Sequence, residues 1–206
     1  MPRPSSPLLS REKIVSGALE FIDAVGLDKF GFYELGRRLG VKGPSLYNYF
    51  RDRDDLLNAV AVAVLDDVKV PEPDGGPWTE WLLEIALGYY RGISAHPRAA
   101  PLLMERRIGA GVAVRVNAAL EGLQEAGVSP ADGLAIADSI EAFALVWVTF
   151  DNTPGAATAF DAAGHDHLPA LQAALTQHTY NEASYRRMMR ALIHGVAELY
   201  VDNAPD

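Results

Sequence analysis

Apolar residues recur at three- and four-residue spacings along most of the chain, a pattern that indicates amphipathic helices. The first such stretch begins after Ser10, a residue type that caps helix starts, and ends at Gly26. Its apolar positions are Ile14, Val15, Ala18, Leu19, Ile22 and Val25. The sequence shows no convincing strand pattern and no internal repeat, so we predict an all-α fold.

Residues 33–57 predict two short helices that are joined by a tight turn. Gly40 stops the first helix, and Gly43-Pro44 opens the second, Ser45–Phe50. Proline suits the first turn of a helix, because its missing N–H would have no partner there. Two such helices form a helix-turn-helix, in which the second helix can lie in the major groove of DNA.

The rest of the chain predicts a larger helical part. The sequence VPEPDGGP at 70–77 breaks any helix, and we interpret it as a loop. Further helices are predicted at 78–95, 112–126, 131–151 and 182–201, with an irregular connection at 152–168. The helix at 131–151 is apolar nearly all round, which is typical of a helix that is buried on several sides.

Composition narrows the class of protein. The chain is 49% hydrophobic and 22% charged, which is typical of a globular protein, and it has no cysteine for a disulfide or a thiolate metal site. The N-terminal sequence MPRPSSPLLS lacks the apolar segment of a signal peptide, and the longest apolar run, at 142–148, is too short to span a bilayer. We therefore expect a cytoplasmic protein with no membrane partner.

Charge is distributed unevenly along the chain. The net charge is −9, yet residues 1–53 contain nine Lys or Arg against six acids, a balance of about +3, so the other 153 residues total about −12. A basic N-terminal part on an acidic body suits a protein that binds DNA by one end.

The segment LGVKGPSLYNYFRDRDDLL resembles the N-terminal domain of TetR-type transcriptional regulators. The shared positions are Leu39-Gly40-Val41, Leu46-Tyr47, Tyr49-Phe50 and Leu56-Leu57. The upstream sequence REKIVSGALEFIDAVGLDKF resembles the first helix of that domain. The strong resemblance covers about the first quarter of the chain, and a weaker one continues through the remainder. It implies a DNA-binding domain at 1–55 and a ligand-binding and dimerisation domain at 56–206.

The resemblance implies a set of DNA contacts around the second helix. Bases are expected to meet Lys42, Gly43, Pro44, Ser45 and Asn48, and phosphates to meet Tyr47, Tyr49 and Arg53. Asn48 could form a bidentate pair with adenine, and Lys42 could approach guanine. The alternative is that Tyr47, Tyr49 and Phe50 are core aromatics of a small helical bundle. Leu46 and Phe50 are assigned to the core on either interpretation.

The chain departs from the family at two places in this domain. A Ser or Thr usually caps the second helix at Gly31-Phe32 and touches a phosphate, whereas Phe32 and Tyr33 occupy this position here. Lys42 replaces a common Ser at the turn, which indicates a different operator preference.

For the body, the resemblance implies a homodimer that binds a palindromic operator. The family pairs its subunits through two C-terminal helices, for which 131–151 and 182–201 are the candidates. Their apolar excess fits this role, because one chain cannot easily cover a helix that is apolar all round. The alternative is that both helices are simply the core of a monomer.

The family also encloses a small inducer in the body. Candidate lining residues are Tyr89, Ile93, Leu103, Met104, Ile108, Phe143, Trp147, Phe150 and His178, each of which could alternatively be core. Such a lining suits a mostly apolar ligand. In tetracycline-binding members a His and a Glu help to hold a magnesium–drug chelate, and an ungapped count places Leu103 and Phe150 at those positions. Neither can ligate a hard cation, so we expect a more apolar ligand than a magnesium–tetracycline complex. We also expect no metal and no cofactor.

Catalytic chemistry finds little support in the sequence. His165-Asp166-His167 is a weak candidate for a metal site and is better interpreted as solvated. The usual motifs of hydrolases, nucleotide-binding enzymes and metalloproteases are missing from the sequence, so we predict that the protein is not an enzyme. Our hypothesis is a homodimeric repressor that a ligand releases from DNA. The alternatives are an all-α small-molecule-binding protein or enzyme with a non-functional DNA motif, and a regulator that binds another protein.

Overall fold

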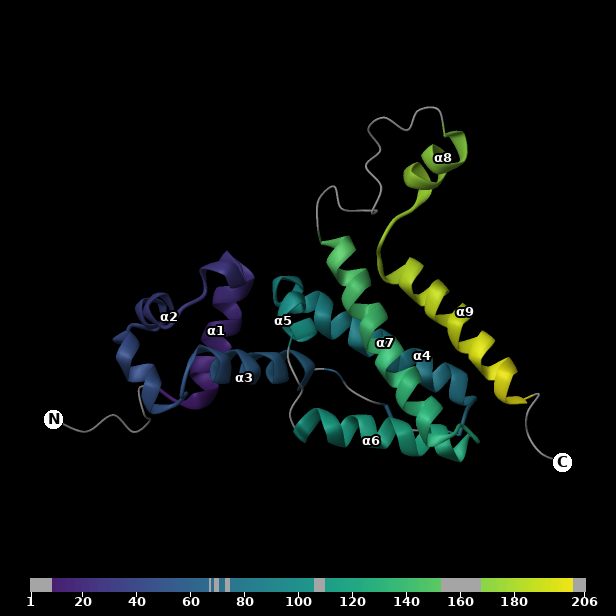
Figure 1. Cartoon of the computed structure of the whole chain (residues 1–206), viewed down its shortest axis with the longest axis horizontal. Helices are drawn as coiled ribbons and strands as arrows, with labels where there is room; N and C mark the ends of the chain where they lie inside the picture. The colour runs from purple at the N-terminus through teal and green to yellow at the C-terminus, as the bar shows by residue number, and fades with distance from the viewer. Residues whose placement is uncertain are drawn as a thin grey trace. The chain divides into compact units, whose positions relative to one another are not determined.

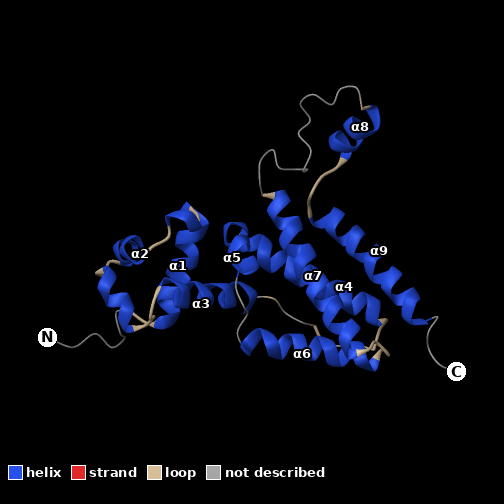
Figure 2. Cartoon of the chain, in the orientation of Figure 1, coloured by secondary structure: helices blue, strands red, loops and turns tan. Residues whose placement is uncertain are grey.

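The computed structural model describes residues 9–66, 68, 71–72, 75–105, 110–152 and 168–201 (Figure 1). All regular elements in these ranges are helices, and no strand occurs among them, which confirms the predicted all-α fold (Figure 2). The elements are α1 Arg11–Val25, η1 Leu27–Lys29, α2 Phe32–Leu39, η2 Gly43–Asn48, α3 Arg53–Asp66, α4 Trp78–Ala95, η3 Pro97–Ala99, α5 Ala100–Glu105, α6 Ala110–Glu125, α7 Pro130–Asp151, α8 Pro169–Gln177 and α9 Glu182–Val201.

Local sequence signals set several helix ends as expected. The Ser10 side chain accepts a hydrogen bond from the backbone N–H of Lys13 at 3.2 Å, which caps the start of α1. Helix α2 ends at Gly40, whose φ of 70° lies in the left-handed region that favours glycine. Ser129 caps α7 in the same way as Ser10 caps α1, with proline in the first turn.

The chain divides into two compact units. The first unit contains residues 1–67 and 95–114, and the second contains 68–94 and 115–206. The boundary that we predicted at 55/56 falls inside α3, which packs against α1 in the first unit. A separation of functions at that residue stays a prediction.

In the first unit, α1, α2, η2 and α3 surround one apolar core. Fully buried side chains from all four elements meet there: Ile14, Ile22, Leu35, Leu46, Phe50 and Leu57. The segment after α4 belongs to this unit as well. Nδ1 of His96 lies 2.7 Å from Oδ2 of Asp23, and Arg98 donates to the carbonyl of Ala24 at 2.8 Å, so both contact the end of α1.

In the second unit, α4 is buried along most of its length and is covered by α6, α7 and α9. Trp81 donates its indole N–H to the carbonyl of Pro71 at 2.7 Å. Its ring reaches α6 at Gly122, where a Cβ atom would lie 2.6 Å from the nearest ring carbon. Tyr185 of α9 is fully buried and donates to the carbonyl of Ala86 at 3.2 Å.

Helix α7 is long and apolar enough to cross a membrane, judged by length and composition alone, with a mean hydropathy of 1.6. The length of the uninterrupted apolar run at 142–148, on which we based the sequence argument, is therefore a poor measure of how apolar the whole helix is. The same composition is found in core helices of soluble proteins, and Ile140, Ala144 and Val148 are indeed buried in this unit.

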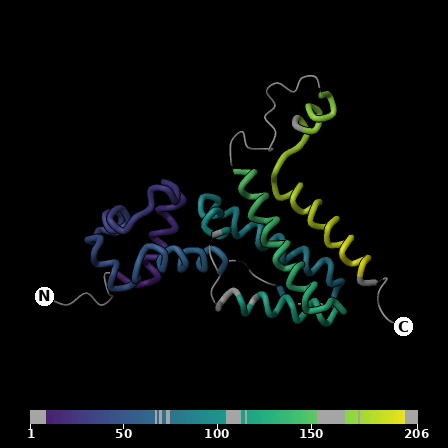
Figure 3. Tube along the Cα trace, in the orientation of Figure 1, coloured from purple at the N-terminus to yellow at the C-terminus, as the bar shows by residue number. Residues whose placement is uncertain are grey.

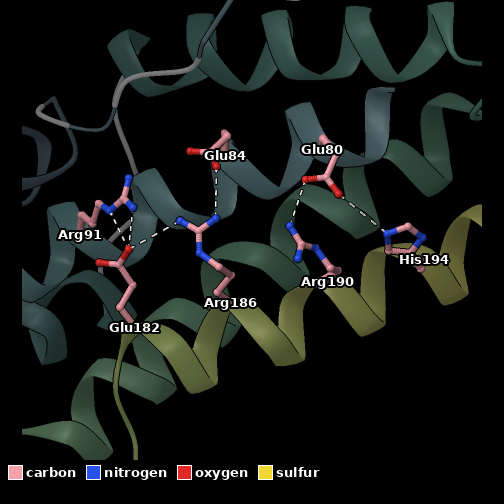
Figure 4. Close-up of polar contacts among 7 residues, drawn as sticks. All are labelled: Glu80, Glu84, Arg91, Glu182, Arg186, Arg190 and His194. Carbon is pink, nitrogen blue, oxygen red and sulfur yellow. Dashed lines mark hydrogen bonds and ion pairs between the residues drawn. The ribbon is translucent and has the colours of Figure 1, made fainter. Parts of the chain in front are cut away.

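A ladder of ion pairs joins α9 to α4 (Figure 4). The α9 residues that take part lie four apart on one stripe of the helix: Glu182, Arg186, Arg190 and His194. Their partners on α4 are Arg91, Glu84 and Glu80, and the distance from Arg190 to Glu80 is 3.1 Å. The hydrogen bonds from Arg91 lower the pKa of the Glu182 carboxyl. Each pair is about half exposed, so the ladder sets the register of α9 more than it adds stability.

Candidate nucleic-acid interface

The helices α2 and η2 touch through two glycines. A Cβ atom on Gly36 would lie 2.8 Å from the backbone nitrogen of Gly43, and one on Gly43 would lie 3.2 Å from the Cα of Tyr33. The backbone N–H of Val41 donates to the carbonyl of Gly36 at 2.9 Å and closes the turn. The backbones of the two helices therefore approach each other more closely than most side chains would allow.

The second helix of this motif differs from the one that we predicted. It is a 3₁₀ helix over Gly43–Asn48, so it begins two residues earlier than the predicted start at Ser45. The backbone N–H of Ser45 bonds the carbonyl of Lys42 at 2.9 Å, and that of Tyr49 bonds Leu46 at 3.0 Å. The tighter winding places Pro44 within the first turn, where it does not interrupt any hydrogen bond.

Exposure separates the predicted contact residues into groups. Lys42, Pro44, Tyr47 and Asn48 are exposed, and Ser45 is half-buried. Gly43 is buried against α2, so it serves the packing of the two helices and does not present the exposed surface that we expected. Tyr47 is 60% exposed although it is aromatic, which argues against the alternative that it is a core residue. Leu46 and Phe50 are buried, which confirms their assignment to the core.

Tyr49 has a partner within the first unit. Its hydroxyl donates to the carbonyl of Leu9 at 2.9 Å, and its own carbonyl accepts from Arg11 at 2.7 Å. The Arg11 guanidinium also covers the ring of Phe50 at 4.0 Å. The Tyr49 hydroxyl thus ties the N-terminal segment to the end of η2, and its predicted phosphate contact stays a prediction.

Arg53 is also held within the first unit. Its Nε donates to the carbonyl of Phe30 at 3.2 Å, and its Nη2 donates to that of Leu27 at 3.4 Å. It therefore fastens the start of α3 to η1. The side chain is still exposed, so a phosphate contact stays a prediction for it too.

The start of α2 lacks the Ser or Thr cap that is usual at this position in the family. Gly31 precedes the helix and makes no side-chain hydrogen bond to it. Phe32 is nearly buried, and its ring centroid lies 4.8 Å from that of Tyr47 at an angle of 57°. Tyr33 is 75% exposed and adjoins Gly43 through its Cα.

The predicted pocket residues are distributed over both units. Leu103 is buried and Met104 is exposed on α5 in the first unit, whereas Tyr89 and Ile93 are buried on α4 in the second. Ile108 lies outside the described residues, as does the His165-Asp166-His167 motif.

The other predicted pocket residues form one aromatic cluster in the second unit. It joins Phe143, Trp147 and Phe150 of α7 to His178, together with three tyrosines that we did not predict: Tyr90, Tyr180 and Tyr185. The ring of Tyr180 lies 4.9 Å from Trp147 and 5.0 Å from Phe150. Tyr180 could have been found, because it follows His178 by two residues in the connection that leads into α9.

Two polar groups in this cluster have unusual surroundings. Trp147 is buried, and its indole N–H has no hydrogen-bond partner in the described part of the chain. Such a group costs free energy unless something else accepts from it. Tyr90 donates to the Asp151 carboxylate at 3.2 Å, and burial raises the pKa of this tyrosine. The cluster is therefore mostly apolar, with a donor and a carboxylate among the rings.

Two hollows border α7 in the second unit. A small cavity of about 30 Å³ lies among α4, α6 and α7, lined by Tyr89, Val116 and Glu141 among others. Burial, and then the negative charge of Asp138, raises the pKa of the Glu141 carboxyl. A groove of about 450 Å³ runs between α7 and α9, which lie side by side in the trace of Figure 3. Its lining is largely apolar and includes Ile136, Phe143, Leu192, Val196 and Leu199.

Comparison with known proteins identifies the class of this helix-turn-helix. Residues 14–60 match the profile of the family described as bacterial regulatory proteins, tetR family. The chain is 28% identical over 183 residues to an HTH-type transcriptional regulator of Saccharopolyspora erythraea, an alignment that covers 88% of this chain and 74% of that protein. It is 29% identical over 167 residues to the class D tetracycline repressor protein of Escherichia coli, covering 79% and 76%.

Residues 14–60 therefore carry the DNA-binding domain of the TetR family. The fold of the chain agrees, because the TetR-family protein ActR of Streptomyces coelicolor, solved in complex with actinorhodin, superposes with a TM-score of 0.77. That alignment covers 94% of this chain and 98% of ActR at 23% identity, and at this identity it shows the fold alone. The chain therefore has a helix-turn-helix of the TetR type and a helical body, as we predicted, and the relatives that it matches along most of its length are transcriptional regulators.

Proposed function

We propose that this protein is a one-component repressor of the TetR family. It binds a palindromic operator as a homodimer, and a small, mostly apolar ligand in the body releases it. The observation that carries the proposal is the exposed edge of η2, where Lys42, Tyr47 and Asn48 face solvent above the buried Leu46. Such a regulator works in the cytoplasm, where its operator lies.

The geometry of η2 supports DNA binding. A helix in the major groove can bond base edges only through side chains on its exposed face. Lys42 and Asn48 are both exposed. Tyrosine hydroxyls commonly bond phosphates and thereby fix the register of a protein on the duplex. The ring of Tyr47 packs against that of Phe32, and its side chain is 60% exposed, so its hydroxyl is available to a phosphate.

The apolar α7–α9 groove supports the proposal of a homodimer. Large apolar side chains along these two helices remain exposed in the single chain: Leu134, Val146, Met188, Leu192 and Leu199. A second copy would cover them with the same surface, because the interface of a two-fold dimer is self-complementary. Two heads that are related by this symmetry would read the two halves of a palindrome.

The aromatic cluster supports a flat, mostly apolar ligand. An acceptor atom on such a ligand would satisfy the buried indole N–H of Trp147. ActR, which shares the fold, was solved with actinorhodin bound. A magnesium–tetracycline chelate fits less well, because Leu103 and Phe150 stand where the metal-binding His and Glu are expected. A coupling of 1–3 kcal/mol between ligand and operator would change occupancy about 5- to 150-fold.

The test begins with operator selection from duplexes that contain a random segment, followed by titration at several salt concentrations. We expect the wild type to enrich a palindrome and to lose affinity steeply as salt rises. The double variant Tyr47→Ala, Asn48→Ala should lose this binding while it still folds and dimerises. Asn117→Ala, which removes an exposed asparagine from α6, is the matched control and should bind as the wild type does. Full operator affinity in the double variant would refute the site.

A further inference from the structure

The start of α2 is the one departure from the family pattern that the proposed contacts leave without a role. The residue before the helix is Gly31, which has no side chain to reach a phosphate. Two aromatic residues follow it, and they lie in opposite surroundings, since Phe32 is nearly buried and Tyr33 is exposed.

The ring of Phe32 packs against the ring of Tyr47. The ring centroids are 4.8 Å apart and tilted by 57°, within the range in which aromatic pairs attract each other. Tyr47 is otherwise 60% exposed, and η2 is too short to hold its side chain by neighbours of its own. The contact with Phe32 therefore limits the orientations that the Tyr47 ring can adopt.

Tyr33 extends the exposed surface of η2 onto α2. Its Cα would lie 3.2 Å from a Cβ on Gly43, so its side chain leaves the backbone directly beside the first residue of η2. It is 75% exposed, and its hydroxyl makes no hydrogen bond to any residue that the structure describes. Exposure of so much aromatic surface brings no stability to the fold.

The charges beside Tyr33 do not oppose an anion. Glu34 is the nearest acid in sequence, and its carboxylate is paired with Arg37 at 2.8 Å. Lys42 and Arg38 are both exposed on the adjoining turn and helix. A phosphate that approaches this surface therefore meets cations and hydroxyls, with the one carboxylate partly neutralised.

We infer that the start of α2 is a second contact with the DNA backbone, in which the Tyr33 hydroxyl donates to a phosphate and Phe32 positions the ring of Tyr47. This inference rests on the proposed DNA binding. Phe32 is a positioning residue, and Tyr33 is the contact residue.

The test for Tyr33 uses the full-length protein, the selected duplex and an unrelated duplex of equal length. Tyr33→Phe removes only the hydroxyl, and we expect it to weaken binding about fivefold per protomer on both duplexes, because a phosphate contact carries no sequence information. The dependence of affinity on salt should not change, since a neutral donor releases no counterion. Tyr33→Lys should instead steepen the slope of log K against log salt by about 0.9 per protomer.

The test for Phe32 is a double-mutant cycle with Tyr47. We expect Phe32→Leu, which keeps the site apolar, to weaken binding in the wild-type background and to have no further effect in Tyr47→Ala. A loss of equal size in both backgrounds would show that Phe32 acts through the fold and would overturn its role. Thermal unfolding of each variant separates loss of contact from loss of folded protein.

The outcomes distinguish this inference from the proposed function. Wild-type protein that binds no duplex at low salt would refute DNA binding altogether. The contact at α2 alone would be refuted by a different result, in which the wild-type protein binds DNA. In that result Tyr33→Phe would bind each duplex with wild-type affinity, and Tyr33→Lys would show the wild-type salt slope.

Discussion

The close approach of α2 and η2 makes a quantitative prediction for Gly36→Ala. The added methyl carbon would lie 2.8 Å from the nitrogen and 2.9 Å from the Cα of Gly43, and 3.0 Å from the carbonyl oxygen of Val41. All three atoms belong to the backbone, so no side chain can turn away and the two helices must move apart. Overpacking of this kind costs about 1–3 kcal/mol.

Part of that cost is offset, because alanine favours a helix interior over glycine by about 1 kcal/mol. We therefore expect a net loss of up to about 2 kcal/mol in the free energy of unfolding. The loss in operator affinity should exceed what the unfolded fraction explains, because η2 is displaced relative to α2. Denaturant titration followed by helical circular dichroism gives the first quantity, and fluorescence anisotropy with a selected duplex gives the second.

Gly195→Ala is the matched control for this substitution. Gly195 lies within α9, and no atom lies within 4 Å of the position that its Cβ would take. The same change should therefore stabilise the folded chain by up to about 1 kcal/mol. If Gly36→Ala matched Gly195→Ala in stability, the two helices would not be in the backbone contact from which we reason.

The other predictions concern the second unit. We expect Glu141→Gln to raise the free energy of unfolding at pH 8 and to leave it nearly unchanged at pH 4. The reason is that the pKa of the Glu141 carboxyl is raised in the folded protein, so wild-type stability falls as pH rises above the ordinary pKa of 4.5. An equal gain at both pH values would contradict this. Leu192→Glu should convert the dimer to monomers in analytical ultracentrifugation, since it places a charge in the apolar α7–α9 groove, and a dimer of unchanged affinity would exclude the groove as the interface. Arg190→Ala should cost less than about 1 kcal/mol, because its pair with Glu80 is half exposed, and this cost should vanish in 1 M salt when measured by denaturant titration.

Features that depend on neighbouring residues were predictable from the sequence. The cap at Ser10 and the left-handed end at Gly40 are local, because the side chain or the backbone dihedral of one residue decides them. The long helices α7 and α9 were predictable for a similar reason, since their apolar positions repeat over many turns. The short helix α8 has only nine residues, which was too few for its pattern to be recognised.

Features that depend on distant residues were not predictable in the same way. The motif predicts a phosphate contact for Tyr49, which stays a prediction, but it does not indicate that the hydroxyl of this residue bonds the carbonyl of Leu9, 40 residues away. Gly43 looked like part of an exposed turn, and only the packing of α2 shows why it is buried. A single sequence contains no signal for either contact, because both arise from the way in which separate helices meet.

Helix α9 links the two parts of the body on which the proposed regulation depends. One stripe of it carries the ion pairs that set its register on α4, and its neighbouring positions supply Leu192 and Leu199 to the groove. Near its start, Tyr185 stacks on Tyr90 of α4 with ring centroids 4.8 Å apart, and it also contacts Trp147. A ligand that displaced the Tyr185 ring would also break its bond to the carbonyl of Ala86 and would move the start of α9. Because α9 also lines the groove, the proposed function implies that occupancy of the cluster changes the geometry of the dimer through this helix.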